Sequence, residues 1–109
     1  MQVEFRIQNT DTDGVLKGYI ERRLRFALGR FGDRVGTVSV RISGNASNDN
    51  ECWINTELRP FGAVTVQETA ADLFAAIDRA TGRIGRLFGR ELQRVRDARM
   101  NRESVRTAA

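Results

Sequence analysis

Hydrophobic and polar side chains alternate in four short stretches of this chain. In the first, Val3, Phe5 and Ile7 are separated by polar residues, which is the period-two pattern of a half-buried strand. The same alternation returns in three later groups of residues: Val38, Val40 and Ile42; Cys52, Ile54, Thr56 and Leu58; Val64 and Val66. The pattern therefore predicts four strands, each with one apolar face.

Two longer stretches repeat their apolar residues with helical spacing. The first runs from about Gly14 to Phe31, and its apolar positions are Leu16, Tyr19, Ile20, Leu24, Ala27 and Phe31. The second runs from Thr69 to about Met100, and its apolar positions are Leu73, Ile77, Ala80, Ile84, Leu87, Phe88 and Val95. Residues 10–13 offer capping side chains for the first helix, and Thr69 with Asp72 resembles a capping box for the second. Each stretch predicts a helix with one core-facing stripe.

The order of these elements is β-α-β-β-β-α, which predicts an α+β fold. Strands one and two, joined through a helix, are expected to be parallel by a right-handed crossover, and strands two to four to form an antiparallel meander. Both helices carry a single apolar stripe, so the simplest architecture is a four-stranded mixed sheet with two helices packed on one face. Residues 1–100 are expected to form one domain. Residues 101–109 have no apolar period and are expected to be a flexible C-terminal tail.

A row of arginines follows the last helix. Five of them are spaced by four, three, four and four residues: Arg79, Arg83, Arg86, Arg90 and Arg94. This spacing places them on one line, roughly 130° around the helix from the centre of the apolar stripe. Like charges so spaced repel by a few tenths of a kcal/mol each, and a phosphate-rich partner would offset that repulsion. A solvated charged face is the plainer alternative.

The first helix is basic as well. Arg22 and Arg25 face away from its apolar stripe, while Arg23 and Arg30 lie at the flank. If the helices are neighbours, their basic faces join in one electropositive surface, with two aromatic residues, Tyr19 and Phe26, near its edge. These two rings are candidates for base stacking or for packing at the edge of the core.

The distribution of charge along the chain supports a basic C-terminal surface. Residues 69–109 hold nine Arg against five acidic residues, so the net charge of +4 comes from this segment. Seventeen of the 18 basic residues are Arg, whose guanidinium suits bidentate phosphate contacts. The composition therefore favours a nucleic-acid partner.

Composition also excludes most enzyme classes. The chain has no histidine, so the usual general base and the commonest metal ligand are missing. The close carboxylate pairs, Asp11 with Asp13 and Asp49 with Glu51, lie in polar segments typical of turns. We therefore expect a protein that is not an enzyme and uses no cofactor or metal. The single cysteine, the start of the chain and the lack of a long apolar run predict a cytoplasmic protein without a membrane span.

Several stretches resemble one known family. They are N-T-D-T-D-G-V-L-K-G-Y-I at 9–20, F-G-D-R-V at 31–35, and D-L-F-A-A-I-D at 72–78 opening the basic helix. Over nearly its whole length the chain resembles the ribosome hibernation-promoting factor and ribosome-associated inhibitor A family, also called sigma-54 modulation proteins. The resemblance implies a stress or stationary-phase factor that binds small-subunit ribosomal RNA around the decoding centre. Such a factor inhibits translation by occupying the positions of messenger and transfer RNA.

The resemblance also implies a set of binding residues. By motif, the family's RNA-binding positions fall on Arg22, Arg23, Arg25, Arg30, Arg79, Arg83, Arg86, Arg90 and Arg94. The implied partner is the small ribosomal subunit with its 16S-type RNA, with no small-molecule substrate. The chain looks like a short form that lacks the C-terminal dimerisation domain of long forms, and we expect a monomer off the ribosome.

Two other classes remain open from the sequence. A double-stranded-RNA-binding domain has a similar plan, but such domains concentrate basic residues at the start of the last helix, and Thr69 to Asp78 contains none. A protein-interaction module is the second alternative, with docking through the sheet face around Trp53, which is expected opposite the helices. Strong salt dependence of binding would favour RNA over protein docking.

Overall fold

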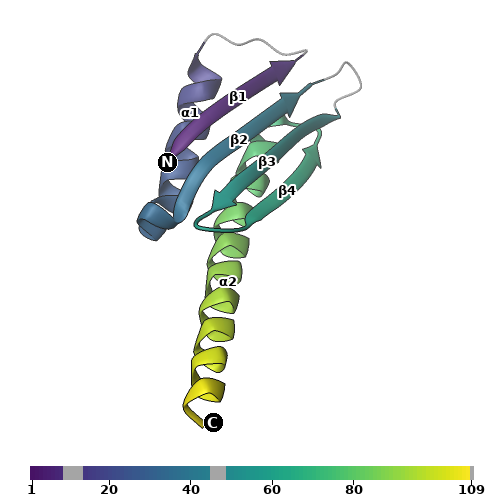
Figure 1. Cartoon of the computed structure of the whole chain (residues 1–109). Coiled ribbons are helices and arrows are strands. Elements are labelled where there is room, and N and C mark those ends of the chain that lie inside the picture. Colours follow the sequence, from purple (N-terminus) through teal and green to yellow (C-terminus); the bar gives the residue numbers. More distant parts are fainter. Residues whose placement is uncertain (9–13, 45–48, 109) are drawn as a thin grey trace.

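All six predicted elements are present in the computed structural model, which describes residues 1–8, 14–44 and 49–108 (Figure 1). In chain order they are β1 Gln2–Gln8, α1 Val15–Leu28, a 3-10 segment η1 Gly29–Arg34, β2 Val35–Ser43, β3 Asn50–Leu58, β4 Ala63–Ala70 and α2 Leu73–Ala108. The predicted order β-α-β-β-β-α is confirmed.

The four strands form one sheet in the order β1-β2-β3-β4. β1 is parallel to β2, whereas β2, β3 and β4 pair antiparallel. One row of apolar residues shows the register: Phe5 lies opposite Val40, Val40 opposite Ile54, and Ile54 opposite Val66. The predicted mixed topology is therefore confirmed, and the period-two pattern puts this row on a single face of the sheet.

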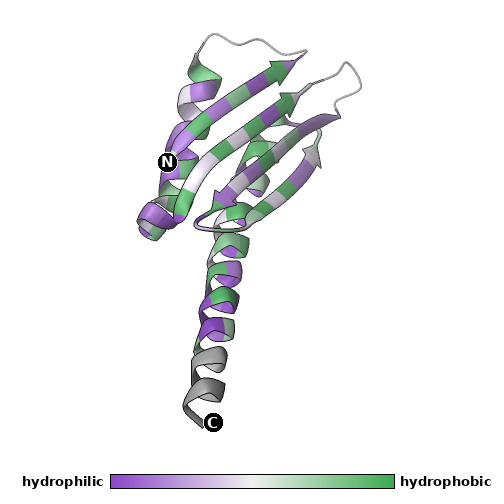
Figure 2. Ribbon diagram, in the orientation of Figure 1, coloured by the Kyte–Doolittle hydropathy of each residue, from purple (hydrophilic) through white to green (hydrophobic). Residues whose placement is uncertain are grey.

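Both helices cover that apolar face (Figure 1). α1 contributes a buried residue on every turn, and α2 contributes a longer buried stripe that ends at Leu92. The buried helical residues are Leu16, Ile20, Leu24, Leu28, Ala76, Ile77, Ala80, Thr81, Ile84, Phe88 and Leu92. Burial of each large aliphatic or aromatic side chain contributes roughly 1.5–3 kcal/mol. The alternating bands along the strands in Figure 2 show the same division between core and solvent.

The opposite face of the sheet is polar. Arg41 lies opposite Trp53 across the β2–β3 pair, and Trp53 lies opposite Gln67 on β4. The Arg41 guanidinium carbon lies 4.6 Å from the centre of the Trp53 ring, a cation–π distance. Trp53 is half-buried, so this face presents a covered tryptophan beside an arginine.

The first helix ends earlier than its apolar pattern predicts. α1 stops at Leu28, and η1 follows to Arg34, with Gly32 at a φ of 56° inside it. That left-handed conformation favours glycine and interrupts the helical path. Phe31 still packs into the core, with its ring centre 4.9 Å from that of Phe88. The capping residues proposed for α1, 10–13, lie outside the described part of the chain.

The start of α2 also differs from the prediction. Thr69 and Ala70 belong to β4, where they pair with Glu51 and Asn50, so Thr69 does not cap the helix. Asp72 does this instead: its carboxylate accepts a hydrogen bond from the Phe74 backbone N–H at 3.2 Å. Pairing with β3 therefore places Thr69 in strand β4, although the local sequence pattern assigned it to the cap of the helix.

The far end of α2 projects from the body of the protein (Figure 1). The helix runs past Met100 to Ala108, longer than predicted, and the principal extents of the molecule are 62 × 23 × 18 Å. The flexibility expected for residues 101–109 stays a prediction. Within the described segments, no helix has the length and apolar character needed to cross a membrane.

Two glycines let the helices approach each other closely. A Cβ at Gly85 would lie 3.1 Å from the Ala27 carbonyl oxygen, and one at Gly89 would lie 3.2 Å from the Phe31 ring. A Cβ at Gly82 would meet only the Arg86 guanidinium, at 3.7 Å. Close helix packing therefore explains Gly85 and Gly89, whereas Gly82 leaves room beside the arginine row.

Candidate nucleic-acid interface

The predicted arginine row lies on the outer face of α2. Arg79, Arg86, Arg90 and Arg94 are exposed, and Arg83 is half-buried. Their helical spacing puts them opposite the buried stripe that includes Ile84 and Phe88, as the sequence predicts. The outer face of α2 therefore presents several guanidiniums to solvent.

Arg83 differs from the rest of the row. Its Nη1 donates to Oε1 of Glu68 on β4 at 2.7 Å, and the Glu68 side chain is only 21% exposed. Arg79 reaches the same strand, where its Nη1 lies 3.5 Å from the Thr69 carbonyl oxygen. These contacts anchor the edge of the row to β4, and the charge of Arg83 is already compensated.

Arg94 has a partner on its own helix. Its Nε donates to Oε2 of Glu91 at 3.1 Å, one turn earlier. This hydrogen bond lowers the pKa of Glu91 and raises that of Arg94. Because the Arg94 side chain is 70% exposed and that of Glu91 is 33% exposed, solvent screens the pair, which is therefore weak, and the guanidinium can exchange partners at little cost.

The basic residues of α1, like those of α2, include exposed side chains and one that is ion-paired. Arg22, Arg25 and Arg30 are exposed. Nε of Arg23 lies 3.4 Å from Oδ1 of Asp78 on α2, in an ion pair whose side chains are both partly exposed. Arg23 thus crosses between the helices, and its charge is shared with an acid that the sequence pattern did not connect to it.

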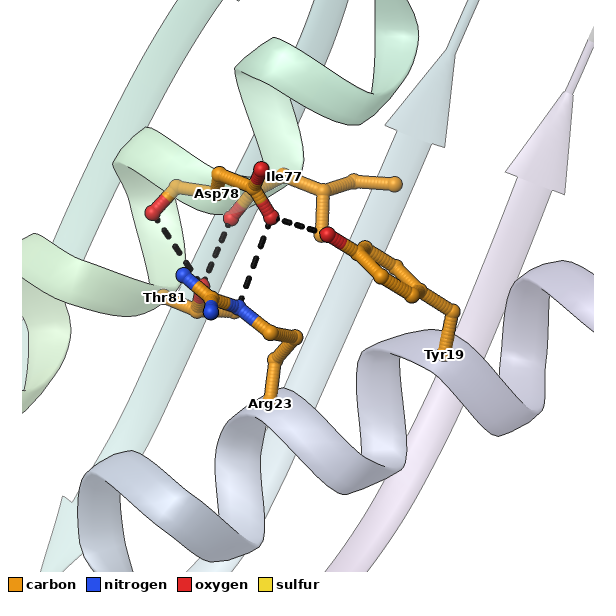
Figure 3. Close-up of polar contacts among 5 residues, drawn as sticks. All are labelled: Tyr19, Arg23, Ile77, Asp78 and Thr81. Carbon is orange, nitrogen blue, oxygen red and sulfur yellow. Dashed lines mark hydrogen bonds and ion pairs between the residues drawn. The ribbon is translucent and has the colours of Figure 1, made fainter.

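Asp78 is the centre of a polar cluster between the two helices (Figure 3). The Tyr19 hydroxyl donates a short hydrogen bond to the same carboxylate oxygen that faces Arg23. This hydrogen bond, together with burial and the charge of Asp78, raises the pKa of Tyr19. The Tyr19 ring also meets Phe74 edge-on, with centroids 5.1 Å apart. Of the two uses considered for Tyr19, packing at the edge of the core is the observed one.

Phe26 has the opposite environment. It is 88% exposed and borders a groove of about 200 Å³ between α1 and α2. The groove is also lined by Arg23, Arg30 and Arg86, and Gly82 forms part of its wall. The basic faces of the two helices therefore meet at this groove, with an exposed aromatic ring on its rim.

Within residues 1–8, 14–44 and 49–108, no three His, Cys, Asp or Glu side chains cluster as metal ligands. Cys52 is buried in the core, where burial raises the pKa of its thiol to about 12. A thiol with so high a pKa is a poor nucleophile at neutral pH.

The fold and this surface define a class: a small α+β domain whose two-helix layer carries an arginine-rich outer face. The chain belongs to the family described as sigma 54 modulation protein / S30EA ribosomal protein, whose model matches residues 3–96. The family named from the sequence motifs is thereby confirmed.

Two solved structures have a similar fold. The N-terminal domain of Protein Y from Thermus thermophilus is 30% identical, with a TM-score of 0.71, over 83% of this chain and 98% of that one. A ribosomal subunit interface protein from Coxiella burnetii is 16% identical, with a TM-score of 0.72, over 85% of this chain and 99% of that one. The second likeness shows the shared fold alone. Comparison with curated protein sequences gives no match.

Proposed function

We propose that this protein associates with the ribosome in the cytoplasm, binds small-subunit ribosomal RNA near the decoding centre, and lowers translation by occupying that site. The observation that carries the proposal is the groove between α1 and α2, which arginines of both helices line. Membership in a family described as ribosomal and the likeness to Protein Y support the ribosome as the partner. Off the ribosome the protein acts as a monomer.

The exposed arginines supply most of the binding energy in this proposal. Arg22, Arg25 and Arg30 on α1, and Arg79, Arg86, Arg90 and Arg94 on α2, reach phosphates without first breaking a buried contact. Each charge-assisted hydrogen bond to a phosphate contributes about 1.5–3 kcal/mol. Arg23 and Arg83 contribute less, because Asp78 and Glu68 already hold them.

Phe26 supplies a contact that does not depend on charge. Ribosomal RNA offers unstacked bases in loops and bulges, and an exposed ring can stack on such a base. Base–aromatic stacking is worth roughly 1–3 kcal/mol. With Arg30 and Arg86 beside it, the Phe26 ring would hold a base while the guanidiniums hold the flanking phosphates.

The alternative of protein docking through the open sheet face has less support. Trp53 is half-buried and covered by Arg41 at 4.6 Å, so it offers little free apolar surface. Salt dependence separates the two modes, because each neutralised phosphate contributes a slope of roughly 0.7–0.9 in log affinity against log salt. Several phosphate contacts give a steep slope, and docking through Trp53 gives a shallow one.

The decisive experiment compares two triple charge reversals in a small-subunit binding assay. The test set, Arg25→Glu, Arg86→Glu and Arg90→Glu, removes exposed charges from both helices. Arg83 is left intact because a glutamate there would face Glu68. The control set, Arg6→Glu, Arg41→Glu and Arg59→Glu, changes the net charge equally on the sheet face and a turn.

The test set is expected to weaken binding by at least about a hundredfold, since three contacts of roughly 1 kcal/mol or more are lost. The control set acts only through screened long-range attraction and is expected to stay within about tenfold of the unaltered protein. Circular dichroism checks that both variants are folded, and a purified translation system checks inhibition. Equal losses in two folded variants would show that overall charge, not this surface, determines binding.

A further inference from the structure

A second group of arginines lies away from the two-helix groove, where α2 passes the turn between β3 and β4 (Figure 1). Here the surface forms a hollow of about 540 Å³. Its lining includes Arg34, Pro60, Phe61, Arg94, Arg96 and Arg99. Small-molecule sites typically measure about 300–1,000 Å³, so the hollow has the volume of a site for one nucleotide-sized ligand.

Backbone hydrogen bonds hold the walls of this hollow in place. The Leu58 N–H donates to the Gly62 carbonyl oxygen at 2.9 Å and closes the turn that carries Phe61. Gly62 has a φ of 128°, which favours glycine at that position. The Arg59 N–H donates to the Arg34 carbonyl oxygen at 2.8 Å and fixes the end of η1 against the same turn. The hollow is therefore a feature of the folded backbone.

The side chains of the hollow combine apolar and cationic surface. Phe61 is 86% exposed and stands next to Pro60, which gives a flat apolar wall. Nε of Arg34 is buried and has no hydrogen-bond partner among the described residues. None of the described residues that line the hollow is acidic.

We propose that this hollow binds a nucleoside phosphate. The base stacks against Phe61 and Pro60, and the phosphate lies among Arg34, Arg96 and Arg99. An exposed aromatic ring beside several guanidiniums matches the two halves of such a ligand, because the base needs an apolar surface and the phosphate needs cationic donors. The same chemistry is available from a free mononucleotide or from one nucleotide of an RNA strand.

This site is separate from the groove of the proposed function. It shares only Arg94 with the RNA-binding set, and Arg94 is exposed and paired with Glu91. Failure of one proposal therefore leaves the other standing.

The test is a nuclear magnetic resonance titration of the whole chain with two probes, ATP and a 5′-phosphorylated tetraribonucleotide. The backbone amide signals of Phe61 and Gly62 report occupancy of the hollow. Adenosine and inorganic phosphate, titrated separately, are each expected to bind more weakly than ATP by about tenfold or more, because each makes only half of the contacts. The variants are Phe61→Ala and Arg34→Gln, with Arg6→Gln, an exposed arginine on β1 outside the hollow, as the control.

We expect saturable shifts at Phe61 and Gly62 with at least one probe. The affinity is expected to fall about tenfold or more in Phe61→Ala and Arg34→Gln, and to stay unchanged in Arg6→Gln. Shifts with ATP identify a free mononucleotide as a ligand, whereas shifts with the tetranucleotide alone identify an RNA strand. Absence of shifts with both probes, or equal affinity in all three folded variants, overturns the proposal.

Discussion

Nε of Arg23 on α1 lies 3.4 Å from Oδ1 of Asp78 on α2, and the same oxygen accepts the hydrogen bond from Tyr19. One carboxylate of the last helix thus holds two side chains of the first. This arrangement links the helices through the polar edge of their interface, and it also partly neutralises an arginine of the proposed RNA-binding set.

Replacing Asp78 with Asn is expected to lower the pKa of Tyr19 toward its ordinary value. The hydrogen bond to Asp78 is the largest cause of the raised pKa, and burial and the Asp78 charge add to it. Tyr19 is the single tyrosine of the chain, so the ultraviolet absorbance of tyrosinate reports it alone. Asp97→Asn, an exposed change on the same helix, serves as the control. An unaltered titration in Asp78→Asn would contradict the hydrogen bond.

The raised pKa of Tyr19 also predicts how stability depends on pH. Its folded pKa exceeds the unfolded value of about 10, so the protonated hydroxyl favours the folded state. This contribution is fully present below the unfolded pKa and is lost as pH rises through the folded pKa. Relative to Tyr19→Phe, which cannot titrate, the unaltered protein is expected to lose free energy of unfolding over that alkaline range, as denaturant titrations would measure.

Releasing Arg83 from its partner is expected to tighten RNA binding. Glu68→Gln removes the carboxylate that lies 2.7 Å from Arg83, so the guanidinium becomes available to phosphate. We expect a gain of roughly two- to tenfold in affinity for small subunits, with a salt slope steeper by about 0.7–0.9.

Glu57→Gln is the matched control for Glu68→Gln. Glu57 pairs with Arg59 at 3.5 Å on a different part of the surface, and its loss changes the net charge equally. It is expected to alter the affinity by less than about twofold, because only screened attraction acts there. If both variants bind equally well, the effect comes from net charge rather than from Arg83.

Gly82 and Gly85 on α2 face different environments, so substitution by alanine is expected to change the free energy of unfolding differently at the two positions. Gly82→Ala adds helix propensity, with a Cβ no nearer than 3.7 Å to the Arg86 guanidinium, and is expected to raise the free energy of unfolding by about 0.5–1 kcal/mol. At Gly85 the new Cβ would press on the Ala27 carbonyl oxygen at 3.1 Å. Gly85→Ala is therefore expected to be less stable than Gly82→Ala by about 1 kcal/mol or more. Urea unfolding measures both, and equal values would mean that the helices do not pack this tightly.

Cys52 is expected to resist thiol reagents in the folded protein. Burial, with a smaller effect from Glu51, raises the pKa of the thiol to about 12, so almost no thiolate exists at neutral pH. A chromogenic disulfide reagent is expected to react with Cys52 only after denaturant unfolds the chain. Rapid labelling without denaturant would show that the strand bearing Cys52 opens readily.

The sequence predicts the strands and helices well because their signals are local. The alternation around Phe5 and the helical spacing around Ile84 each depend on neighbouring residues, and they identify the face that packs on the core. Element ends were less accurate where a distant partner decides them. Thr69 joins β4 because Glu51, far away in the sequence, pairs with it.

The candidate site could be predicted as a surface but not in its details. Helical spacing predicts that Arg86 and Arg90 face solvent, and they do. It cannot show that Arg83 meets Glu68, because that pair depends on how α2 lies against β4. Nor can it distinguish Phe26, which is exposed, from Tyr19, which is hydrogen-bonded. These contacts come from the packing of whole elements.

Because α2 projects beyond the sheet, its amide protons are protected from solvent exchange to different degrees along the helix. Around Ile84 and Phe88 the helix is anchored in the core, so its amide protons exchange with solvent only when the whole domain opens. From Arg96 to Met100 the side chains are half-buried or exposed, so the amide protons of these turns exchange by local opening that leaves the core folded. Amide exchange is therefore expected to rise steeply along one continuous helix. A partner that covers its outer turns would slow exchange there without altering the core.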